Sequence, residues 1–472
     1  MVVGDIEVGT DLLVVGAGPA GYTLAIRCAR MGIDVTLVNR NELGGVCLHK
    51  GCVPVKTLLH VFRLAEDCKN ASGMGINSDG VSVDFKKAYA WKDTVVKRLE
   101  TGIRELCRGS GVQVMEGTCS FTSSSSATVN GPSGTQHVVF KRAVIATGAR
   151  HKPLPGLPFD GKQIIDPNEV LSFDEKPEDI ILLGGGYAGV TMAALMVAQG
   201  KRLTFIHKNS QIMSFLDDDL LQPVMKKFKE KGVKIYSSSS WSVKRSGDKV
   251  IVDLGQDGKK DSVSADKLVP VIGMLPNTDG IGLENTGVRT NKDGYIMTDG
   301  NYRTDDRALY AIGDARDRHC NASKAFRDGM SLADILSGKP GWPEYIALPQ
   351  TISTEPEIAS AGLTETAAKN AGIEVITGKF PFTASGKAVS MGKTEGFVKV
   401  VAEKSSHRIL GVHVICTDAF DILQEGVLAI EMGARLEDIA LTLHPHPTLC
   451  EAIREACAAA LGTSTNVVPG SS

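Results

Sequence analysis

The sequence predicts an α/β protein with two Rossmann-like domains followed by a C-terminal α+β domain. At roughly 150 residues per domain, a chain of 472 residues has room for about three domains. Residues 11–40 align without a gap on residues 179–208, and each copy runs from an apolar segment through a glycine-rich turn and an alanine-rich helix to a second apolar segment. After a stretch with prolines and glycine at 338–348, residues 349–462 mix strand-like and helical segments. The repeat therefore predicts two βαβ units, and the last part predicts a separate domain.

The composition is that of a folded, nearly neutral protein. Lys and Arg total 52 and Asp and Glu total 54, so the net charge is −2, which argues against a polyanion-binding protein. Apolar residues make up 42% and charged residues 22%, so the chain can bury a sizeable core. Apolar runs stay below about 18 residues, and Asp5 and Glu7 lie where a signal peptide would be basic and then apolar. The ten cysteines are too scattered for a disulfide scaffold. We therefore expect a soluble, cytoplasmic protein.

Both copies of the repeat carry a G-x-G-x-x-G turn between the first apolar segment and the helix. The first glycine permits a tight turn, the second lets a pyrophosphate approach the backbone, and the third lets the helix pack close to the strand. One such turn is weak evidence, because any glycine-rich turn can produce it. Two turns in matching contexts predict two dinucleotide-binding domains. The glycines are Gly16, Gly18 and Gly21 in the first copy and Gly184, Gly186 and Gly189 in the second.

The segments beyond the two repeats indicate how the domains are divided. The expected parts are 1–150 for the first dinucleotide domain, 151–270 for the second, 271–345 for a return to the first, and 346–472 for the C-terminal domain. Two short apolar strands, 143–146 and 309–312, run into Thr147–Gly148 and Gly313–Asp314. Both resemble strand ends that contact a bound cofactor.

Two cysteines lie close together in the segment GGVCLHKGCVPVK at 44–56. On an ideal helix the spacing of Cys47 and Cys52 is a rise of about 7.5 Å, which exceeds the roughly 4.4–6.8 Å Cα separation of a disulfide. A bridge would need distorted backbone, for which Gly51 supplies freedom and Pro54 constrains the following residues. Further ligands at zinc-like spacing are missing nearby in the sequence, so a metal site is not predicted. Two ordinary buried thiols remain an alternative, but the position favours a reducible disulfide.

Further motifs accompany the cysteine segment along the chain. They are ATGAR (146–150), GGGYAG (184–189), FLDDDL (215–220), PNTDG (276–280), YAIGDA (310–315), TEPEIASAGLTE (354–365) and HPHPTLCEA (444–452). With them the chain resembles the pyridine nucleotide–disulfide oxidoreductases over nearly its whole length, and most closely the dihydrolipoamide dehydrogenases. The resemblance implies FAD on the first βαβ unit and a nicotinamide dinucleotide on the second, NAD with NADP possible. It also implies that the C-terminal domain is a dimerisation domain, which forms a homodimer.

The resemblance assigns roles to individual residues near the flavin. Cys47 corresponds to the thiol that exchanges with the substrate disulfide, and Cys52 corresponds to the thiol that faces the flavin. Lys56 matches the lysine beside the flavin. Asp314 matches the carboxylate that binds the FAD ribityl chain, and Gly313 is its glycine neighbour.

The His-Pro-Thr segment supplies the remaining catalytic residues. His446 matches the acid/base histidine that reaches across the dimer interface, and Glu451 matches the carboxylate that orients it. The chemistry agrees, because a thiol needs a proton acceptor that works near neutral pH and an imidazole needs a partner that fixes its tautomer. Thr448-x-x-Glu451 is also a capping box that would open the last helix. In that alternative Glu451 serves only the backbone.

Four positions depart from the family's pattern. Asn39 stands where a glutamate usually binds the FAD adenosine ribose, although an amide also hydrogen-bonds a hydroxyl. Thr191 replaces the glutamate that partners the flavin-side lysine. His207 replaces the acidic residue that binds the NAD ribose, and Met274 replaces an arginine on the nicotinamide side. We therefore expect intact disulfide chemistry and altered nicotinamide binding.

The resemblance implies that the protein oxidises a dithiol, protein-bound dihydrolipoamide above all, and passes two electrons through Cys47, Cys52 and FAD to a nicotinamide. The implied partner is the lipoyl domain of a 2-oxo acid dehydrogenase or glycine-cleavage complex, and neither a nucleic acid nor a membrane is expected. Two rivals stay open. One is a reductase of another small disulfide in the same family, and the other is a flavoprotein subunit with weak nicotinamide turnover.

Overall fold

The computed structural model describes residues 7–40, 42–132, 134–173, 178–208, 212–256 and 259–467. The chain forms two compact units that alternate along the sequence. Unit 1 comprises Met1–Lys152, Leu171–Asp174 and Gly273–Glu344, and unit 2 comprises Pro153–Val170, Glu175–Ile272 and Tyr345–Ser472. Within the described residues, the helices lack the combination of length and apolar character that a membrane span requires.

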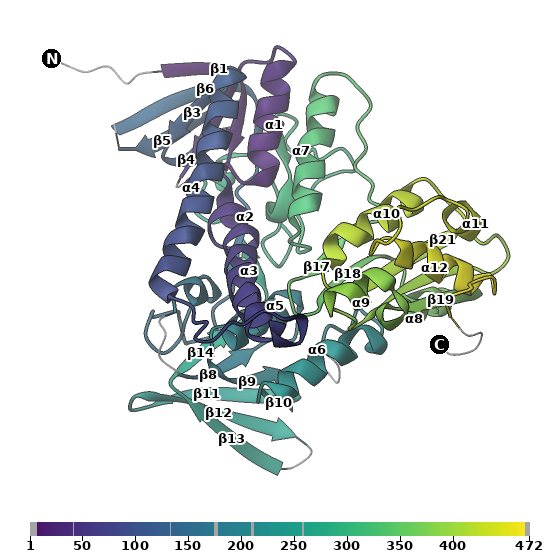
Figure 1. Cartoon of the computed structure of the whole chain (residues 1–472). Helices are drawn as coiled ribbons and strands as arrows, with labels where there is room; N and C mark the ends of the chain where they lie inside the picture. Colours follow the sequence, from purple (N-terminus) through teal and green to yellow (C-terminus); the bar gives the residue numbers. More distant parts are fainter. Residues whose placement is uncertain are drawn as a thin grey trace. The chain divides into compact units, whose positions relative to one another are not determined.

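Unit 1 is built on a seven-stranded sheet with the order β3-β2-β1-β6-β5-β4, in which β16 also pairs with β6. Figure 1 labels β1, β3, β4, β5 and β6 of this sheet. The parallel strands are β1 (Glu7–Val15), β2 (Val35–Asn39), β3 (Gln113–Glu116), β6 (Gly134–Ile145) and β16 (Leu309–Ala311). The antiparallel strands are β4 (Thr118–Ser123) and β5 (Ser126–Gly131), and a separate ribbon pairs β7 (Ala149–His151) with β15 (Met274–Pro276). Because β1, β6 and β16 are parallel neighbours, their carboxyl ends meet at one edge of the sheet.

The helices of unit 1 lie in the first copy of the repeat, in the segment between the two copies, and after the second copy. They are α1 (Pro19–Arg30), α2 (Gly45–His49), α3 (Cys52–Lys69), α4 (Phe85–Gly109) and α7 (Ala322–Leu336). Short 3-10 turns lie at Ala71–Met74, Leu283–Asn285 and Gly313–Ala315, and a further one, Pro167–Ser172, includes the sequence boundary of the two units at Val170. α1 starts with a proline, whose fixed φ suits the first helical position. α1 and α7 pack against each other, and Leu12, Leu24 and Leu332 are fully buried in the core that they share with the sheet.

Unit 2 contains the second βαβ unit. Its parallel sheet has the order β10-β9-β8-β14, with strands β8 (Asp179–Leu183), β9 (Arg202–His207), β10 (Lys234–Ser237) and β14 (Lys267–Pro270). α5 (Tyr187–Ala198) follows β8, and α6 (Asp218–Glu230) follows β9. An antiparallel meander of β11 (Ser240–Ser246), β12 (Lys249–Gln256) and β13 (Lys259–Ala265) adds a layer. Val250 and Val252 of the meander share a core with Ile181 and Ile206 of the parallel sheet.

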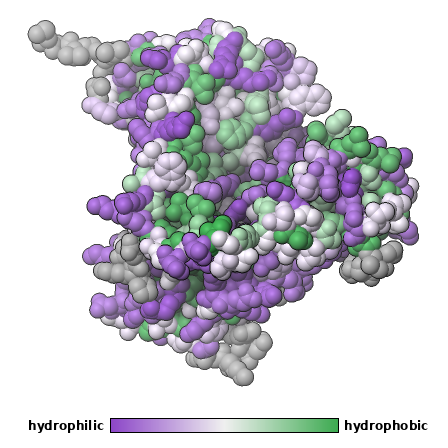
Figure 2. Space-filling model, viewed as in Figure 1, coloured by the Kyte–Doolittle hydropathy of each residue, from purple (hydrophilic) through white to green (hydrophobic). Residues whose placement is uncertain are grey.

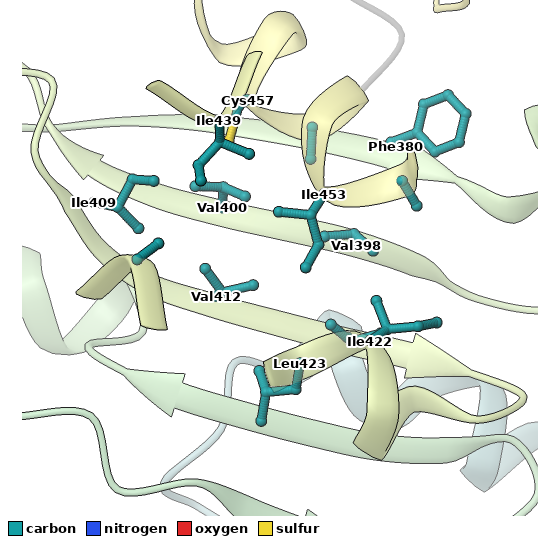
Figure 3. Close-up of a cluster of buried hydrophobic side chains, with 14 of the residues drawn as sticks. Phe380, Val398, Val400, Ile409, Val412, Ile422, Leu423, Ile439, Ile453 and Cys457 are labelled. Atoms are coloured by element: carbon teal, nitrogen blue, oxygen red, sulfur yellow. The ribbon is translucent and has the colours of Figure 1, made fainter. Parts of the chain in front are cut away.

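The C-terminal part of unit 2 is an antiparallel sheet covered by helices. Its order is β17-β18-β21-β20-β19, with β17 (Gln350–Ile352), β18 (Glu357–Gly362), β19 (Val375–Pro381), β20 (Phe397–Glu403) and β21 (Ile409–Cys416). The helices are α8 (Glu365–Asn370), α9 (Gly386–Met391), α10 (Ala419–Glu431), α11 (Leu436–Ala440) and α12 (Glu451–Ala460), and Phe382–Ala384 is a 3-10 turn. Val398, Val400 and Val412 of the sheet meet Ile422 and Ile453 of the helices in a core that excludes water (Figure 3). This is the α+β domain that the sequence predicts.

Candidate active site

The first glycine-rich turn joins β1 to α1 at the carboxyl edge of the sheet of unit 1. A Cβ on Gly16 (φ +108°) would lie 2.3 Å from the Ala146 carbonyl oxygen, and a Cβ on Gly21 would lie 1.8 Å from the Gly16 carbonyl oxygen. A Cβ on Gly18, by contrast, would meet nothing within 4 Å, and no described side chain caps the N-terminus of α1. The first and third glycines are therefore required by the fold. The second leaves open the space where backbone N–H groups suit a pyrophosphate.

The strand ends that were predicted to contact FAD are neighbours in the structure. Val15 pairs with Ile145, and Ile145 pairs with Ala311, so the residues that follow these strands meet at the edge that carries the glycine turn. There the Thr147 hydroxyl is buried and has no hydrogen-bond partner within the described part of the chain. A Cβ on Gly148 would again lie in open space. A buried hydroxyl of this kind needs a partner, and a bound flavin dinucleotide fits that need.

Asn39 is the last residue of β2, on the strand next to β1, and it is buried with 5% of its surface exposed. Its backbone carbonyl accepts a hydrogen bond from Gly117 N–H at 2.9 Å. The side chain therefore belongs to the same carboxyl edge as the glycine turn. This is the position at which a ribose hydroxyl would be bound in a βαβ dinucleotide site.

Asp314 directly follows Gly313, whose backbone N–H binds Asp328, a residue that the sequence did not indicate. The N–H of Gly313 donates to Oδ2 of Asp328 at 2.9 Å, and Lys324 Nζ lies 3.1 Å from the same oxygen. Asp328 is fully buried and forms an ion pair with Lys324. Burial raises the pKa of Asp314 to about 6, and the Cys320 thiol is hydrogen-bonded to it. The i, i+4 spacing of Lys324 and Asp328 on α7 is the sequence signal that could have indicated this pair.

The two predicted redox cysteines lie on different helices. Cys47 is in α2, Cys52 is the first residue of α3, and the helical path is interrupted at Lys50 and Gly51. Gly51 has φ −135° and ψ −109°, which is far from helical geometry. The break brings the two sulfur atoms into hydrogen-bonding contact. Both are free thiols in the structure, so their oxidation to a disulfide stays a prediction.

The two thiols differ in their acidity. The hydrogen bond from the Cys47 thiol lowers the pKa of Cys52 to about 7 against the effect of burial, and the Lys56 ammonium lowers it further. The same hydrogen bond, together with burial, raises the pKa of Cys47. Cys52 is therefore the thiol that ionises first, near neutral pH. Since the thiolate is the reactive form of cysteine, the pair is prepared for thiol–disulfide chemistry.

His446 and Glu451 form a second cluster, in unit 2. Nδ1 of His446 lies 3.0 Å from Oε1 of Glu451, and the N–H of Thr448 donates to Oε2 of Glu451 at 2.9 Å. Burial opposes ionisation of Glu451, but these two hydrogen bonds prevail and lower its pKa. The carboxylate therefore holds the ring of His446 in a fixed orientation. The His446 side chain is 79% exposed on the isolated chain.

The expected capping box at the start of the last helix is only half formed. α12 begins at Glu451, with Cys450 at the cap position. The Thr448 hydroxyl donates to the Pro445 carbonyl oxygen at 2.9 Å, and Thr448 lies outside α12, whose N-terminus has no side-chain cap within the described residues. Glu451 does bind the Thr448 N–H, but its other oxygen contacts His446. Glu451 therefore contacts both the backbone and the His446 ring, and its role toward His446 stays a prediction.

The second glycine-rich turn, in unit 2, repeats the geometry of the first. A Cβ on Gly184 (φ +127°) would lie 2.0 Å from the Val271 carbonyl oxygen, and a Cβ on Gly189 would lie 1.9 Å from the Gly184 carbonyl oxygen. A Cβ on Gly186 would meet nothing within 4 Å, and α5 also begins without a side-chain cap from the residues that the structure describes. The residues present therefore fit a second dinucleotide.

The three altered nicotinamide-side positions are distributed over both units. His207 ends β9 and is 6% exposed, and a Cβ on Gly185 would lie 2.8 Å from the His207 Cβ, so this residue packs against the second glycine turn. Thr191 lies on α5, just after that turn. Met274 belongs to unit 1, where β15 pairs it with His151. The structure therefore brings His207 and Thr191 to the second glycine-rich turn. The roles of His207, Thr191 and Met274 in nicotinamide binding stay predictions.

Comparisons with known proteins define the family. Residues 10–329 match the pyridine nucleotide-disulphide oxidoreductases, and residues 348–457 match the dimerisation domain of the same family. The chain is 37% identical to the dihydrolipoyl dehydrogenases of Geobacillus stearothermophilus and Bacillus subtilis, over 99% of this chain and 100% of each relative. The structure of LpdA from Mycobacterium tuberculosis has the same fold, with a TM-score of 0.87 and 24% identity over 95% of this chain and 99% of that one. The chain therefore belongs to the pyridine nucleotide-disulphide oxidoreductase family.

Membership of this family settles the general chemistry. The protein is an FAD-dependent disulfide oxidoreductase that uses a nicotinamide dinucleotide, as the resemblance implies. The predicted fold class, with two Rossmann-like domains and a C-terminal dimerisation domain, is confirmed.

Proposed function

We propose that this protein acts as a dihydrolipoyl dehydrogenase, which oxidises protein-bound dihydrolipoamide and reduces NAD. The observation that carries the proposal is the pair of thiols at the break between α2 and α3, one of which ionises near neutral pH. Full-length relatives that bear this name support the choice of substrate. The intact Cys47, Cys52 and His446 favour turnover over the rival of a flavoprotein subunit with weak nicotinamide activity.

In the proposed reaction His446 accepts the proton of one substrate thiol, while Glu451 holds the ring in the tautomer that can accept it. The substrate thiolate attacks Sγ of Cys47 in the oxidised pair, the sulfur–sulfur bond breaks, and Cys52 leaves as a thiolate. The second substrate thiol then displaces Cys47, which gives the cyclic disulfide product and a reduced pair. The lowered pKa of Cys52 makes it a good leaving group. When bound, FAD supplies the acceptor that takes the electron pair and passes it to the nicotinamide.

The proposed cofactor contacts follow the two glycine turns. FAD would lie in unit 1, where Gly18 and Gly148 leave space for it. The buried hydroxyl of Thr147 and the carboxyl group of Asp314 would bind it. We assign Gly16, Gly21, Asn39, Lys56 and Gly313 to the same site, and Gly184, Gly186, Gly189, Thr191, His207 and Met274 to the nicotinamide side. A pyrophosphate at each helix N-terminus would receive backbone N–H groups.

The dimerisation domain presents an apolar surface close in sequence to His446. Leu441 and Leu443 are 82% and 95% exposed, and Met432, which directly follows α10, is 76% exposed. Figure 2 shows apolar side chains gathered over α10 and α11. Apolar side chains this exposed are typical of a protein interface. They support the proposal that His446 acts on the cysteine pair of a second copy of the chain.

The proposed macromolecular partner is the lipoyl domain of a 2-oxo acid dehydrogenase or glycine-cleavage complex, in the cytoplasm. The substrate arm of such a domain carries the dithiol that the Cys47–Cys52 pair would oxidise. Neither a nucleic acid nor a membrane is part of the proposal, since the net charge is −2.

An anaerobic titration tests the proposed function. The purified yellow protein is mixed with dihydrolipoamide and then with NAD, while the flavin absorbance and the formation of NADH are followed. We expect bleaching of the flavin by dihydrolipoamide and its recovery with NAD, and neither change in a Cys47→Ser variant. Bleaching without NADH formation would favour the flavoprotein-subunit rival. Oxidation of NADH by another small disulfide, with dihydrolipoamide inert, would favour the rival reductase.

A further inference from the structure

Asp217, in the FLDDDL motif, binds the N-terminus of a helix that is not its own. It occupies the N-cap position of α6, where an aspartate usually accepts hydrogen bonds from the first turn of its own helix, but that bond is not formed by this residue. Instead Oδ2 accepts from Glu365 N–H at 3.1 Å, and Oδ1 accepts from the N–H and hydroxyl of Thr366 at 3.3 and 2.7 Å. Glu365 and Thr366 open α8 of the dimerisation domain. Asp217 therefore connects the second dinucleotide domain to the dimerisation domain within unit 2.

Lys399, on β20, balances the charge at this contact. Its Nζ lies 3.0 Å from Oδ2 of Asp217, 2.8 Å from Oε2 of Glu365 and 3.5 Å from Oδ2 of Asp219. The side chains of Lys399 and Asp217 are 9% and 8% exposed. Burial opposes ionisation of both, but their hydrogen bonds prevail, raise the pKa of Lys399 and lower that of Asp217 to about 2. Removal of Lys399 would leave the buried carboxylate of Asp217 without its counter-charge, and removal of Asp217 would leave the Lys399 ammonium with only Glu365 and Asp219 as acidic partners.

A short bonded segment joins Asp217 to the second glycine turn. The N–H of Leu216 donates to the Met213 carbonyl oxygen at 2.9 Å, and the N–H of Met213 donates to the Gly185 carbonyl oxygen at 2.8 Å. Met213 has φ +50°, in the left-handed region. A residue other than glycine adopts this conformation only where its surroundings fix the backbone. Leu216 and Met213 are 5% and 2% exposed. A displacement of Asp217 would therefore reach Gly185, the middle of the turn.

We propose that Lys399 and Asp217 are positioning residues, which hold the nucleotide-binding turn at 184–186 in place from the dimerisation domain. The inference rests on the proposed assignment of the nicotinamide dinucleotide to that turn. Lys399 acts through Asp217 and Met213 on the Gly185 backbone, so the effect is confined to nicotinamide binding. The FAD turn at 16–18 belongs to unit 1 and has its own contacts.

The test compares Lys399→Met with the wild-type holoenzyme and with Lys399→Arg, which keeps the charge. A matched control is Lys404→Met, because Lys404 is 66% exposed and pairs with Glu374 at 3.6 Å just beyond the same strand. We measure the Kd for NADH by calorimetric titration, the KM values for NAD and dihydrolipoamide, the FAD content, and amide hydrogen exchange in the peptide that contains Met213.

In Lys399→Met we expect the Kd for NADH and the KM for NAD to rise roughly tenfold or more, because a small misplacement of a binding group has effects of this size. Exchange at Met213 should be faster, the KM for dihydrolipoamide and the FAD content should stay unchanged, and Lys399→Arg should restore most of the affinity. Asp217→Asn keeps the shape of the side chain and should also raise the Kd for NADH and the KM for NAD. This second variant tests the inference if Lys399→Met folds poorly.

Two outcomes would overturn the inference. If wild-type protein turns over NAD while Lys399→Met and Asp217→Asn keep the wild-type Kd and the wild-type exchange at Met213, the contact is merely structural and the proposed function stands. If the wild-type protein binds no nicotinamide dinucleotide, the proposed function fails as well.

Discussion

Substitution of single glycines by alanine should separate cofactor binding from folding. In Gly18→Ala the new Cβ meets nothing within 4 Å, and φ at this position is −73°, which alanine adopts readily. The apoprotein should therefore be as stable as wild type, or more stable by about 0.4–1 kcal/mol because the unfolded chain loses freedom. In Gly21→Ala the Cβ would lie 1.8 Å from the Gly16 carbonyl oxygen, so the helix must shift, at a cost of at least about 1–3 kcal/mol.

The effect of Gly18→Ala on FAD follows from the same geometry. The methyl group fills the space through which a pyrophosphate approaches the N-terminus of α1. Each lost hydrogen bond between a backbone N–H and a charged phosphate oxygen is worth roughly 1.5–3 kcal/mol. The Kd for FAD should therefore rise by about ten- to hundredfold for each bond lost.

The assay combines thermal unfolding of the apoprotein with titration of FAD, followed by the fluorescence of the free flavin. Gly186→Ala is the matched control, because its Cβ also meets nothing within 4 Å but lies in the second turn. It should keep FAD affinity and lose affinity for NADH. Wild-type FAD affinity in Gly18→Ala, or wild-type stability in Gly21→Ala, would refute the reasoning.

Three further predictions concern the chemistry of the site. The reduced protein should be alkylated with a half-maximal rate near pH 7, because the Cys52 thiolate forms as pH rises through its lowered pKa; a midpoint near the ordinary thiol value of about 8.5 would contradict the assigned hydrogen bond. Mixing inactive Cys47→Ser subunits with inactive His446→Ala subunits should restore activity, since a mixed dimer holds one complete site; demonstrated subunit exchange without activity would disprove the shared site. His207→Glu should increase the ratio of kcat/KM for NAD over NADP, because a carboxylate binds the ribose diol and repels a 2′-phosphate; an unchanged ratio would remove His207 from cofactor selection.

The features that could be predicted from the sequence are those set by neighbouring residues. The glycine triplets are such a case, because Gly16 and Gly21 are required by backbone contacts that any strand–turn–helix of this kind makes. The break at Gly51 is another, because five residues of regular helix would keep the two cysteines apart. The helical segments expected within residues 349–462 include α10 for the same reason, since its pattern of apolar residues is local.

The features that could not be predicted depend on contacts between distant segments. Asp328 binds the N–H of Gly313 only because α7 packs beside the end of β16. The partial capping box at Glu451 shows the limit of a local motif, because one oxygen of this residue is taken by His446. The unequal acidity of the two thiols depends on burial and on the direction of one hydrogen bond, neither of which spacing reveals.

The contact between Asp217 and Lys399 limits how this chain can be recombined with its relatives. Consider a chimaera in which residues 151–270 of this chain are replaced by the corresponding segment of a relative. The relative's residue at position 217 would then face Lys399 of this chain. Without an acidic residue there, the largely buried ammonium loses one of its three acidic partners, and the first N–H groups of α8 lose their acceptor, so the contact between the two domains is destabilised. The nicotinamide-binding segment is therefore not independent of the dimerisation domain. An exchange of this segment should transfer the residues at positions 217, 365 and 399 together.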